Sequence, residues 1–326
     1  MSKTAFVTGI TGQDGSYLAE LLLQKGYDVY GMVRRLSSPN TTKIAHIMDR
    51  VHLVDGDMTD QSSLITALEE CRPDEIYNLA AQSFVGTSFR QPVLTADVNG
   101  LGVIRLLDAA RSVVPDARIY QASTSELFGA TEEMPQSETT PFHPRSPYGV
   151  AKILAYWACV NYRESYGMHV SNGILFNHES PRRGFEFVTR RITYGVARIY
   201  HGMSKELTLG NLESKRDWGY APEYVEAMWR MMQQNEPDDY VVATGEIHSV
   251  KEFLELAFKE AGISDYEKHV KSDTRLLRPA DVQTLCGNPA KANKVLGWEA
   301  KTKVPELVKI MVEADIQRVA AEGRQR

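Results

Sequence analysis

The feature that most constrains the fold is a glycine-rich turn directly after the first buried strand. Thr4 to Thr8 reads as a short buried strand, and an apolar-periodic helix is expected from Tyr17 to Leu23. Between them lies a G-x-x-G-x-x-G turn made of Gly9, Ile10, Thr11, Gly12, Gln13, Asp14 and Gly15. Backbone N–H groups at such a helix start can approach a pyrophosphate, whose charge the helix dipole favours. The spacing is a variant of the usual G-x-G-x-x-G, and its place in a βαβ unit favours a dinucleotide site over a plain tight turn.

The end of the next strand indicates which dinucleotide binds. The expected strand Asp28 to Val33 runs into Arg34 and Arg35, at the position where an NAD site would place an Asp or Glu for the ribose hydroxyls. A guanidinium instead suits a 2′-phosphate, with Ser37 and Ser38 as further donors. We therefore expect NADP rather than NAD. The alternative is a solvated basic loop.

Two later strand ends supply further candidate contacts to the dinucleotide. Asp57 and Met58 follow the expected strand His52 to Asp55. The expected strand Glu75 to Asn78 is followed by a run of mostly small and polar residues, Leu79, Ala80, Ala81, Gln82 and Ser83. Ligands of open α/β sheets bind outside the carboxyl ends of the strands. We therefore expect these residues to border the cofactor.

Tyr148 and Lys152, four residues apart, form the candidate reaction centre, with a Ser-Thr-Ser run at 123–125 upstream. On a helix these two residues share a face, so the ammonium can lie beside the phenol and favour the phenolate. A base that works near pH 7 needs the phenol pKa to fall by roughly 3 units from about 10, which the ammonium and a positive cofactor ring could supply together. An ordinary helix-surface pair has the same spacing. The glycine turn and the upstream Ser/Thr run favour the catalytic interpretation.

Composition narrows the class of protein. The chain has 326 residues, enough for two domains or for a Rossmann domain with a smaller companion. Its net charge of −5 argues against a nucleic-acid partner. The cysteines have neither metal-ligand nor redox spacing, so we expect no metal site and a reduced, cytoplasmic setting. We find no signal-peptide pattern and no 18-residue apolar run, and we expect no membrane partner.

The order of the expected elements indicates an α/β fold with a Rossmann-type, doubly wound parallel sheet. Strand-like and helix-like runs alternate from residue 1 to about 175, and the alternation breaks down after Phe176. The C-terminal third is expected to be a smaller α/β lobe that covers the cofactor. Further expected elements are a strand at 117–122, a helix at 148–166, a strand at 169–175 and helices at 218–233, 250–261 and 289–296.

Six blocks of sequence carry a resemblance to a known family. They read VTGITGQDG at 7–15, LAAQSFV at 79–85, QASTSELFG at 121–129, PRSPYGVAK at 144–152, FNHESPRRG at 176–184 and RDWG at 216–219. Together they resemble the GDP-mannose 4,6-dehydratase family of the extended short-chain dehydrogenase/reductase superfamily, over residues 5 to about 298. The resemblance implies conversion of GDP-D-mannose to GDP-4-dehydro-6-deoxy-D-mannose with tightly held NADP.

The resemblance assigns roles to four residues. A 4,6-dehydratase takes hydride from C4, removes the acidified proton at C5, expels water from C6 and returns the hydride there. Tyr148 would deprotonate the C4 hydroxyl, Lys152 would hold the nicotinamide ribose, and Thr124 would hydrogen-bond the C4 oxygen. Glu126 would be the acid and base at C5 and C6. A nucleotide-sugar 4-reductase or epimerase has no need of Glu126, and a non-catalytic NADP sensor has no need of the four together; both remain alternatives.

The resemblance also implies binding residues outside the reaction centre. His178 and Arg183 match cofactor-binding positions. Positions that contact the nucleotide sugar match Ser83, Asn177, Val188, Arg191, Arg216, Arg278 and Asp281. The guanidinium groups suit a diphosphate, which offers bidentate acceptors. Two positions depart from the family: Asp281 stands where Glu is usual, and Tyr220 where His is frequent, so substrate affinity and packing of the lobe can differ.

The resemblance implies two units and an oligomer. Residues 1–175, with returning segments near 217–243 and 284–298, are expected to form the NADP-binding Rossmann domain. Residues 176–216 and 244–326 are expected to form the nucleotide-sugar-binding lobe. The loop 35–43 is expected to reach a neighbouring subunit near its cofactor, which predicts a homotetramer. A dimer built on helices of the 90–110 and 148–166 regions is the alternative.

Overall fold

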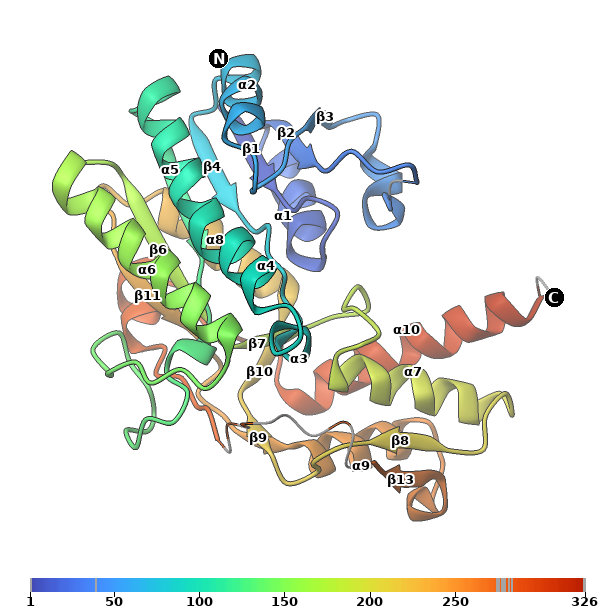
Figure 1. The fold of residues 1–326 in the computed structure, drawn as a ribbon. Helices are drawn as coiled ribbons and strands as arrows, with labels where there is room; N and C mark the ends of the chain where they lie inside the picture. The colour runs from blue at the N-terminus through green and yellow to red at the C-terminus, as the bar shows by residue number, and fades with distance from the viewer. Residues whose placement is uncertain are drawn as a thin grey trace.

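A seven-stranded parallel sheet forms the centre of the structure (Figure 1). The computed structural model describes residues 2–38, 40–273, 276, 280, 282 and 284–324. Each neighbouring pair of strands runs parallel. The expected doubly wound α/β sheet is therefore confirmed. Across the sheet the strands are β11 (Asp239–Val242), β6 (Val170–Leu175), β5 (Arg118–Ala122), β4 (Glu75–Asn78), β1 (Thr4–Thr8), β2 (Asp28–Val33) and β3 (His52–Asp55).

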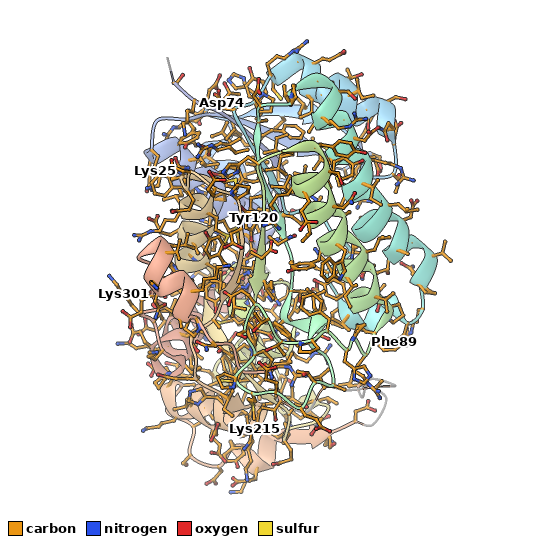
Figure 2. The ribbon with its side chains drawn as sticks, turned by 90° about the vertical axis from the view of Figure 1, so that its left-hand side faces the viewer. Lys25, Asp74, Phe89, Tyr120, Lys215 and Lys301 are labelled. Atoms are coloured by element: carbon orange, nitrogen blue, oxygen red, sulfur yellow. The ribbon has the colours of Figure 1, made fainter. Side chains whose placement is uncertain are left out.

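Helices cover both faces of the sheet, and each face has its own apolar core. Figure 2 shows the sheet nearly edge-on, with Tyr120 of β5 between the two helical layers. Buried strands read as apolar runs, and the strands from β1 to β6 lie within about a residue of the expected ranges. The strand β11 was not expected. One layer consists of α1 (Gln13–Gln24) and α8 (Ala221–Met232), and the other of α2 (Gln61–Cys71), α5 (Gly102–Val113) and α6 (Pro147–Tyr166).

The direction of strand addition reverses between β1 and β4. The chain first adds β2 and β3 on one side of β1, then crosses to β4, β5, β6 and β11 on the other. The Thr8 hydroxyl joins the two strand ends there: it donates to Asn78 Oδ1 at 2.6 Å and accepts from the N–H groups of Leu79 and Ala80 at 3.0 Å each. A crevice at such a reversal point is where open α/β sheets bind ligands.

A third apolar core lies below the sheet in Figure 1, where α7 (Val188–Tyr200), α9 (Val250–Glu260) and α10 (Val304–Arg324) pack together. Within the described ranges, no helix is long and apolar enough to cross a membrane. Three short strand pairs border this core: β7 (Asn177–Glu179) with β10 (Trp218–Tyr220), β9 (Lys215–Arg216) with β12 (His248–Ser249), and β8 (Leu207–Leu209) with β13 (Val270–Ser272). Among the described residues, the other short helical segments are η1 (Thr42–Ile47), α3 (Val85–Ser88), α4 (Pro92–Ala96), η2 (Asp97–Leu101), η3 (Ser125–Leu127), η4 (Tyr266–His269) and η6 (Ala292–Leu296).

Three expected elements are corrected. The helix expected from Tyr17 begins at Gln13, so its first turn belongs to the glycine turn. The helix expected from Trp218 begins only at Ala221, because residues 218–220 pair with β7 as the strand β10. The C-terminal region holds more than short helices, since α10 has 21 residues. Its buried positions recur every three or four residues, but Asp315 occupies one of them and interrupts the apolar pattern.

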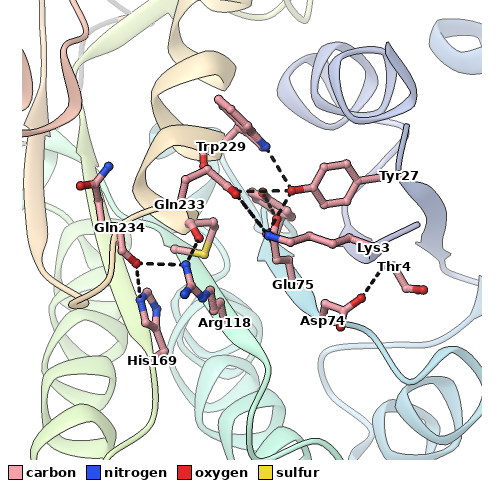
Figure 3. A network of polar contacts seen from close by, with 12 residues as sticks. Lys3, Thr4, Tyr27, Asp74, Glu75, Arg118, His169, Trp229, Gln233 and Gln234 are labelled. Carbon is pink, nitrogen blue, oxygen red and sulfur yellow. Dashed lines mark hydrogen bonds and ion pairs between the residues drawn. The ribbon is translucent and has the colours of Figure 1, made fainter. Parts of the chain in front are cut away.

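A polar network fixes the amino-terminal edge of the sheet (Figure 3). Glu75, the first residue of β4, is fully buried, and its carboxylate accepts hydrogen bonds from Lys3 Nζ at 2.8 Å, Tyr77 OH at 2.7 Å and Gln233 Nε2 at 3.2 Å. Nearby, Nη1 of Arg118 donates to the carbonyls of residues 232 and 234 at 2.7 and 3.0 Å. The end of α8 is thereby held against the start of β4 and β5.

Replacing Glu75 by Ala is expected to destabilise the fold by about 1–3 kcal/mol, because the buried Tyr77 hydroxyl loses its acceptor. Unfolding by urea, followed by circular dichroism, measures the change. The control is Asp116→Ala, an exposed position at the same edge, which is expected to stay within about 0.5 kcal/mol of the parent. Equal stability of the two variants would show that the network contributes nothing.

Candidate active site

The glycine turn is shaped by two close approaches of the backbone. Gly9 has φ +70°, and a Cβ there would lie 3.0 Å from the backbone nitrogen of Ala80. A Cβ at Gly15 would lie 2.3 Å from the carbonyl oxygen of Gly9. Gly12 is the N-cap of α1, and no side chain caps that helix start. The turn therefore needs glycine on steric grounds, and it leaves the first turn of α1 facing the crevice.

A cleft of about 500 Å³ opens at this turn. Its volume falls in the usual range for small-molecule and cofactor sites. The residues expected at the cofactor come together here from the ends of β1, β2, β3 and β4. Those that line the cleft are Gly9, Thr11, Gly12, Gln13, Asp14, Gly15, Arg34, Asp57, Met58, Leu79, Ala80, Ala81, Gln82, Ser83 and Arg183. Ile10 does not: its side chain is fully buried in the core beneath the turn.

The cleft also has lining residues that the sequence did not indicate. Two are cations, Lys43 of η1 and Arg182. Arg182 stands next to Arg183 in a basic run, which is a usable signal, whereas Lys43 is brought in only by the path of the loop after β2. Burial lowers the pKa of Lys43, with Glu186 opposing that shift and the guanidinium groups of Arg190 and Arg182 adding to it. The other unpredicted lining residues are Met32, Leu94, Val98, Gly184, Glu186 and Phe187.

The donor and acceptor groups of the cleft fit a phosphorylated dinucleotide. Cations crowd one region, because Arg34, Lys43, Arg182 and Arg183 all line the same cleft. Such a grouping concentrates positive potential where an anion can bind. The buried Oε1 of Gln82 has no hydrogen-bond partner among the described residues, so it is an acceptor that a ligand hydroxyl or amide can satisfy.

The start of α6 presents Tyr148 and Lys152 on one face. Ser146 caps the helix by accepting a hydrogen bond from Gly149 N at 3.1 Å, and Pro147 takes the first helical position. Lys152 is buried; its Nζ donates to the carbonyl of Ala122 at 2.7 Å and lies 5.9 Å from the centre of the Tyr148 ring. The carbonyl of β5 thus fixes the ammonium next to the phenol.

Thr124 and Glu126 reach the same place from the other side, on the turn after β5. The Thr124 side chain lies beside the Tyr148 phenol, and it opposes the rise in the pKa of that phenol. Its Oγ1 also accepts a hydrogen bond from Glu126 N at 3.2 Å, and Glu126 acts electrostatically on Tyr148. The structure therefore brings together all four residues expected at the reaction centre. Arg183 and Asp14 of the cleft also influence the Tyr148 hydroxyl.

The polypeptide alone does not lower the pKa of the phenol. Burial raises the pKa of Tyr148 to about 12; the hydrogen bond with Thr124 opposes this rise and the Glu126 carboxylate adds to it. Burial also lowers the pKa of Lys152 to about 8. A base role for Tyr148 near neutral pH therefore requires further positive charge beside the phenol, beyond that of Lys152.

His178 lies behind the cleft rather than in its lining. It is buried and stacks on Tyr224 with ring centres 4.6 Å apart. Its Nδ1 faces the carbonyl of Phe176 at 2.8 Å, and its Nε2 faces Asp14 Oδ2 at 2.8 Å. Both oxygens accept, so both ring nitrogens can donate when the ring is protonated. Its side chain thus contacts Asp14 and ties β7 to the glycine turn.

The charge of His178 depends on this pair. Burial lowers the pKa of the imidazole, but the Asp14 carboxylate and the Phe176 carbonyl outweigh burial and raise it above its ordinary 6.5. Burial likewise opposes ionisation of Asp14, yet His178 holds the pKa of that carboxyl below its ordinary value. The ion pair is therefore complete between about pH 3.8 and pH 6.5; it is lost as the pH rises through the raised pKa of His178 or falls through the lowered pKa of Asp14.

The residues expected at the nucleotide sugar are spread over the lower lobe. Asn177 lies in β7, Val188 begins α7, Arg191 follows one turn later, and Arg216 is buried in β9. These four do not line the cleft, whereas Ser83 does. Tyr220, where His is frequent in the family, is half-buried at the end of β10. Two expected substrate residues, Arg278 and Asp281, lie outside the described residues.

Comparison with known proteins places the chain in a family. The family model described as GDP-mannose 4,6 dehydratase matches residues 6–311. GDP-mannose 4,6 dehydratase 2 of Caenorhabditis elegans is 54% identical, covering 98% of this chain and 91% of the relative. The GDP-mannose 4,6 dehydratase of Homo sapiens is 50% identical, covering 97% and 92%.

Solved structures share the fold at lower identity. RMD from Pseudomonas aeruginosa complexed with NADPH has a TM-score of 0.82 at 23% identity, covering 97% of this chain and 100% of that one. The dTDP-glucose 4,6-dehydratase DesIV from Streptomyces venezuelae, with NAD and TYD bound, has a TM-score of 0.86 at 20% identity, covering 98% of each chain. With the match over residues 6–311 and the identities near 50%, these findings lead to one conclusion: the chain belongs to the GDP-mannose 4,6 dehydratase family.

Proposed function

We propose that the chain converts GDP-mannose to GDP-4-dehydro-6-deoxy-mannose and water, with NADP bound in the cleft. The observation that supports this most is the half-buried carboxylate of Glu126 beside the Thr124–Tyr148 pair. Tyr148 and Lys152 alone are sufficient for a reductase or an epimerase, whereas elimination of water needs a second acid–base group. Membership of the family and relatives near 50% identity support the same activity.

The NADP site we propose uses the cleft. Bound NADP supplies a hydride acceptor that becomes the hydride donor later in the same turnover, and it adds positive charge near the reaction centre. The first turn of α1 would hold the pyrophosphate and Arg34 would hold the 2′-phosphate, while Lys43 adds positive charge to the same cleft. The unpartnered Oε1 of Gln82 accepts from a hydroxyl or amide of the cofactor. His178 contributes through its ion pair with Asp14.

The roles at the reaction centre follow from the positions of the side chains. Tyr148 accepts the proton of the C4 hydroxyl, and Thr124 hydrogen-bonds the C4 oxygen. Lys152, fixed by the carbonyl of Ala122, stabilises the phenolate. Glu126 takes the proton from C5 and gives it to the hydroxyl that leaves C6 as water. The hydride would then return to C6 and the proton taken up by Tyr148 would pass to C5, so one water departs for each sugar and the enzyme ends unchanged.

We assign the nucleotide sugar to the lower lobe. Ser83, Asn177, Val188, Arg191 and Arg216 are its proposed contacts, and Arg278 and Asp281 complete the set. The separate core of α7, α9 and α10 supports a lobe made of residues 176–216 and 244–326. The strand β11 belongs to the main sheet, and α8 packs in the apolar core on one of its faces. Both observations support a Rossmann domain of residues 1–175 with returning segments near 217–243 and 284–298.

A reducing, cytoplasmic setting is part of the proposal. Cys71, Cys159 and Cys286 are free and buried. Burial raises the pKa of the Cys71 thiol to about 12 and that of Cys286 to about 11, and it raises the pKa of Cys159 as well. Thiols of this kind carry little thiolate at neutral pH and are unreactive toward disulfide exchange. They suit a compartment that does not demand disulfides.

The Glu126→Gln variant is expected to separate oxidation from elimination. Tyr148 and Thr124 still support oxidation at C4, but the amide cannot take the C5 proton, so water loss slows by at least roughly 10²-fold. Reduced nicotinamide then accumulates after GDP-mannose is added, as near-ultraviolet absorbance. Tyr148→Phe is the matched control, in which that signal is suppressed because the first step loses its base. Mass spectrometry of the parent reaction should give a product lighter by one water; parental turnover in Glu126→Gln would move the elimination to another carboxylate.

Cofactor preference is expected to depend on Arg34. Arg34→Asp removes a partner of the 2′-phosphate and adds like charge, so the preference for NADP over NAD falls by roughly 10- to 150-fold, the value of a charge-assisted contact. Calorimetric titration of both cofactors into the stripped protein measures it. Arg35→Asp is the matched control, because Arg35 is 90% exposed beside Asp55 and does not line the cleft. Equal affinity of the parent for NADP and NAD would disprove the assignment.

We propose a homotetramer that contains a dimer interface on α4, η2 and α6, which pack against one another. Large apolar side chains are exposed there: Val93, Leu94, Leu101, Val150, Leu154 and Trp157. Multi-angle light scattering of the parent is expected to give four times the 36.6 kDa chain mass. Trp157→Asp is expected to reduce the assembly, whereas Tyr200→Ser, an equally exposed position on α7, leaves it intact. A monomeric parent at micromolar concentration would contradict the proposal.

A further inference from the structure

The segment between β7 and α7 forms one wall of the cleft. We call residues 180–184 the cleft strap, because Arg182, Arg183 and Gly184 line the cleft and the segment crosses the start of α1. Side chains tie it to α1: Ser180 Oγ donates to Gln13 Oε1 at 2.8 Å, and Arg182 Nη1 lies 2.6 Å from Glu20 Oε1. Residues 181–184 of the strap are half-buried, and two of its main-chain carbonyls, those of Pro181 and Arg183, accept hydrogen bonds from a side chain.

Arg190 supplies those hydrogen bonds from within the lower lobe. It lies in α7, is 1% exposed, and its Nη1 donates to the carbonyl of Pro181 and, at 3.0 Å, to the carbonyl of Arg183. Its other side binds Asp315, with Nε 2.8 Å from Oδ2 and Nη2 2.6 Å from Oδ1. One guanidinium therefore joins the cleft strap to a carboxylate of α10.

Asp315 is fully buried where α10 packs along α7 (Figure 1). Besides Arg190, it accepts a hydrogen bond from Thr193 Oγ1 at 2.7 Å. Burying an ion pair is costly, and well-packed apolar residues of similar volume are often as stable or more so. Packing of α7 against α10 therefore does not require this pair. The pair has another effect: it holds the Arg190 guanidinium, whose remaining N–H groups donate to the main chain of the cleft strap.

We propose that Arg190 and Asp315 are positioning residues for NADP: they fix the cleft strap at Pro181 and Arg183 so that Arg182 and Arg183 face the cleft, and thereby set how tightly NADP is held. The proposal rests on the NADP site of the proposed function. The reacting atoms of the sugar are not involved. The expected effect is therefore on NADP affinity and retention, with turnover at saturating NADP close to that of the parent.

The test replaces both members of the pair at once, Arg190→Met with Asp315→Leu, so that no charge is left buried without a partner. The control is Arg118→Met, because Arg118 also donates through Nη1 to two main-chain carbonyls, at the opposite edge of the sheet (Figure 3). NADP affinity is measured by calorimetric titration of the stripped full-length proteins. NADP retention after gel filtration and the thermal unfolding midpoint are recorded for each.

We expect the double variant to bind NADP at least about 10-fold more weakly while its unfolding midpoint stays near that of the parent, and Arg118→Met to bind as the parent does. Parental affinity in the double variant, or equal weakening by Arg118→Met, overturns the proposal. Should the double variant fail to fold, Thr193→Val, which removes one hydrogen bond from Asp315, is expected to weaken binding about 2- to 10-fold. Unchanged affinity there overturns it too. A parent that binds no NADP refutes the proposed function itself.

Discussion

The hydroxyl of Thr8 holds together the two strand ends on which the whole site depends. It bonds Asn78 of β4 and receives the next two backbone N–H groups, so β1 and β4 end at the same level. Gly9 fits against Ala80 because it lacks a Cβ, which would lie 3.0 Å from the backbone nitrogen of Ala80. The glycine turn, the 79–83 run and the cleft between them all follow from this junction, since a ligand can approach the main chain only where strand addition reverses.

The charge around this junction is set by the carboxylate of Asp14 and by the cations that face it or line the cleft. Asp14 stands in the first turn of α1, where its charge would oppose a pyrophosphate, but His178 pairs with it. Lys43, Arg182 and Arg183 add positive charge around the cleft. At the reaction centre the balance is opposite, because burial and Glu126 together favour the neutral phenol of Tyr148. The side chains of the cleft thus favour binding of an anion. They do not ionise Tyr148, so lowering its pKa depends on the positive charge of the bound ligand.

The sequence predicts those parts of the molecule whose signal is local. Strands buried on both faces and the i, i+4 pair of Tyr148 and Lys152 are readable from neighbouring residues, and the strands from β1 to β6 are where the sequence predicts them, whereas β11 was not expected. Lys43 could not be placed, because its position depends on how the loop after β2 folds back. The extent of α10 was missed, since Asp315 breaks the apolar repeat. The contact of His178 with Asp14 could not be foreseen, because pairing over 164 residues leaves no local trace in the sequence.

The ion pair between Arg190 and Asp315 affects the order in which the protein folds during its synthesis. Domains fold as the chain leaves the ribosome, amino-terminal segments first. The glycine turn and its helix emerge early, but the two partners of this pair are 125 residues apart, and Asp315 belongs to the final helix described. Until that helix is translated, Arg190 lacks its carboxylate. The wall of the cleft therefore matures only after residue 315 has been synthesised, and a nascent chain that stalls before this residue carries the sheet without the Arg190–Asp315 pair.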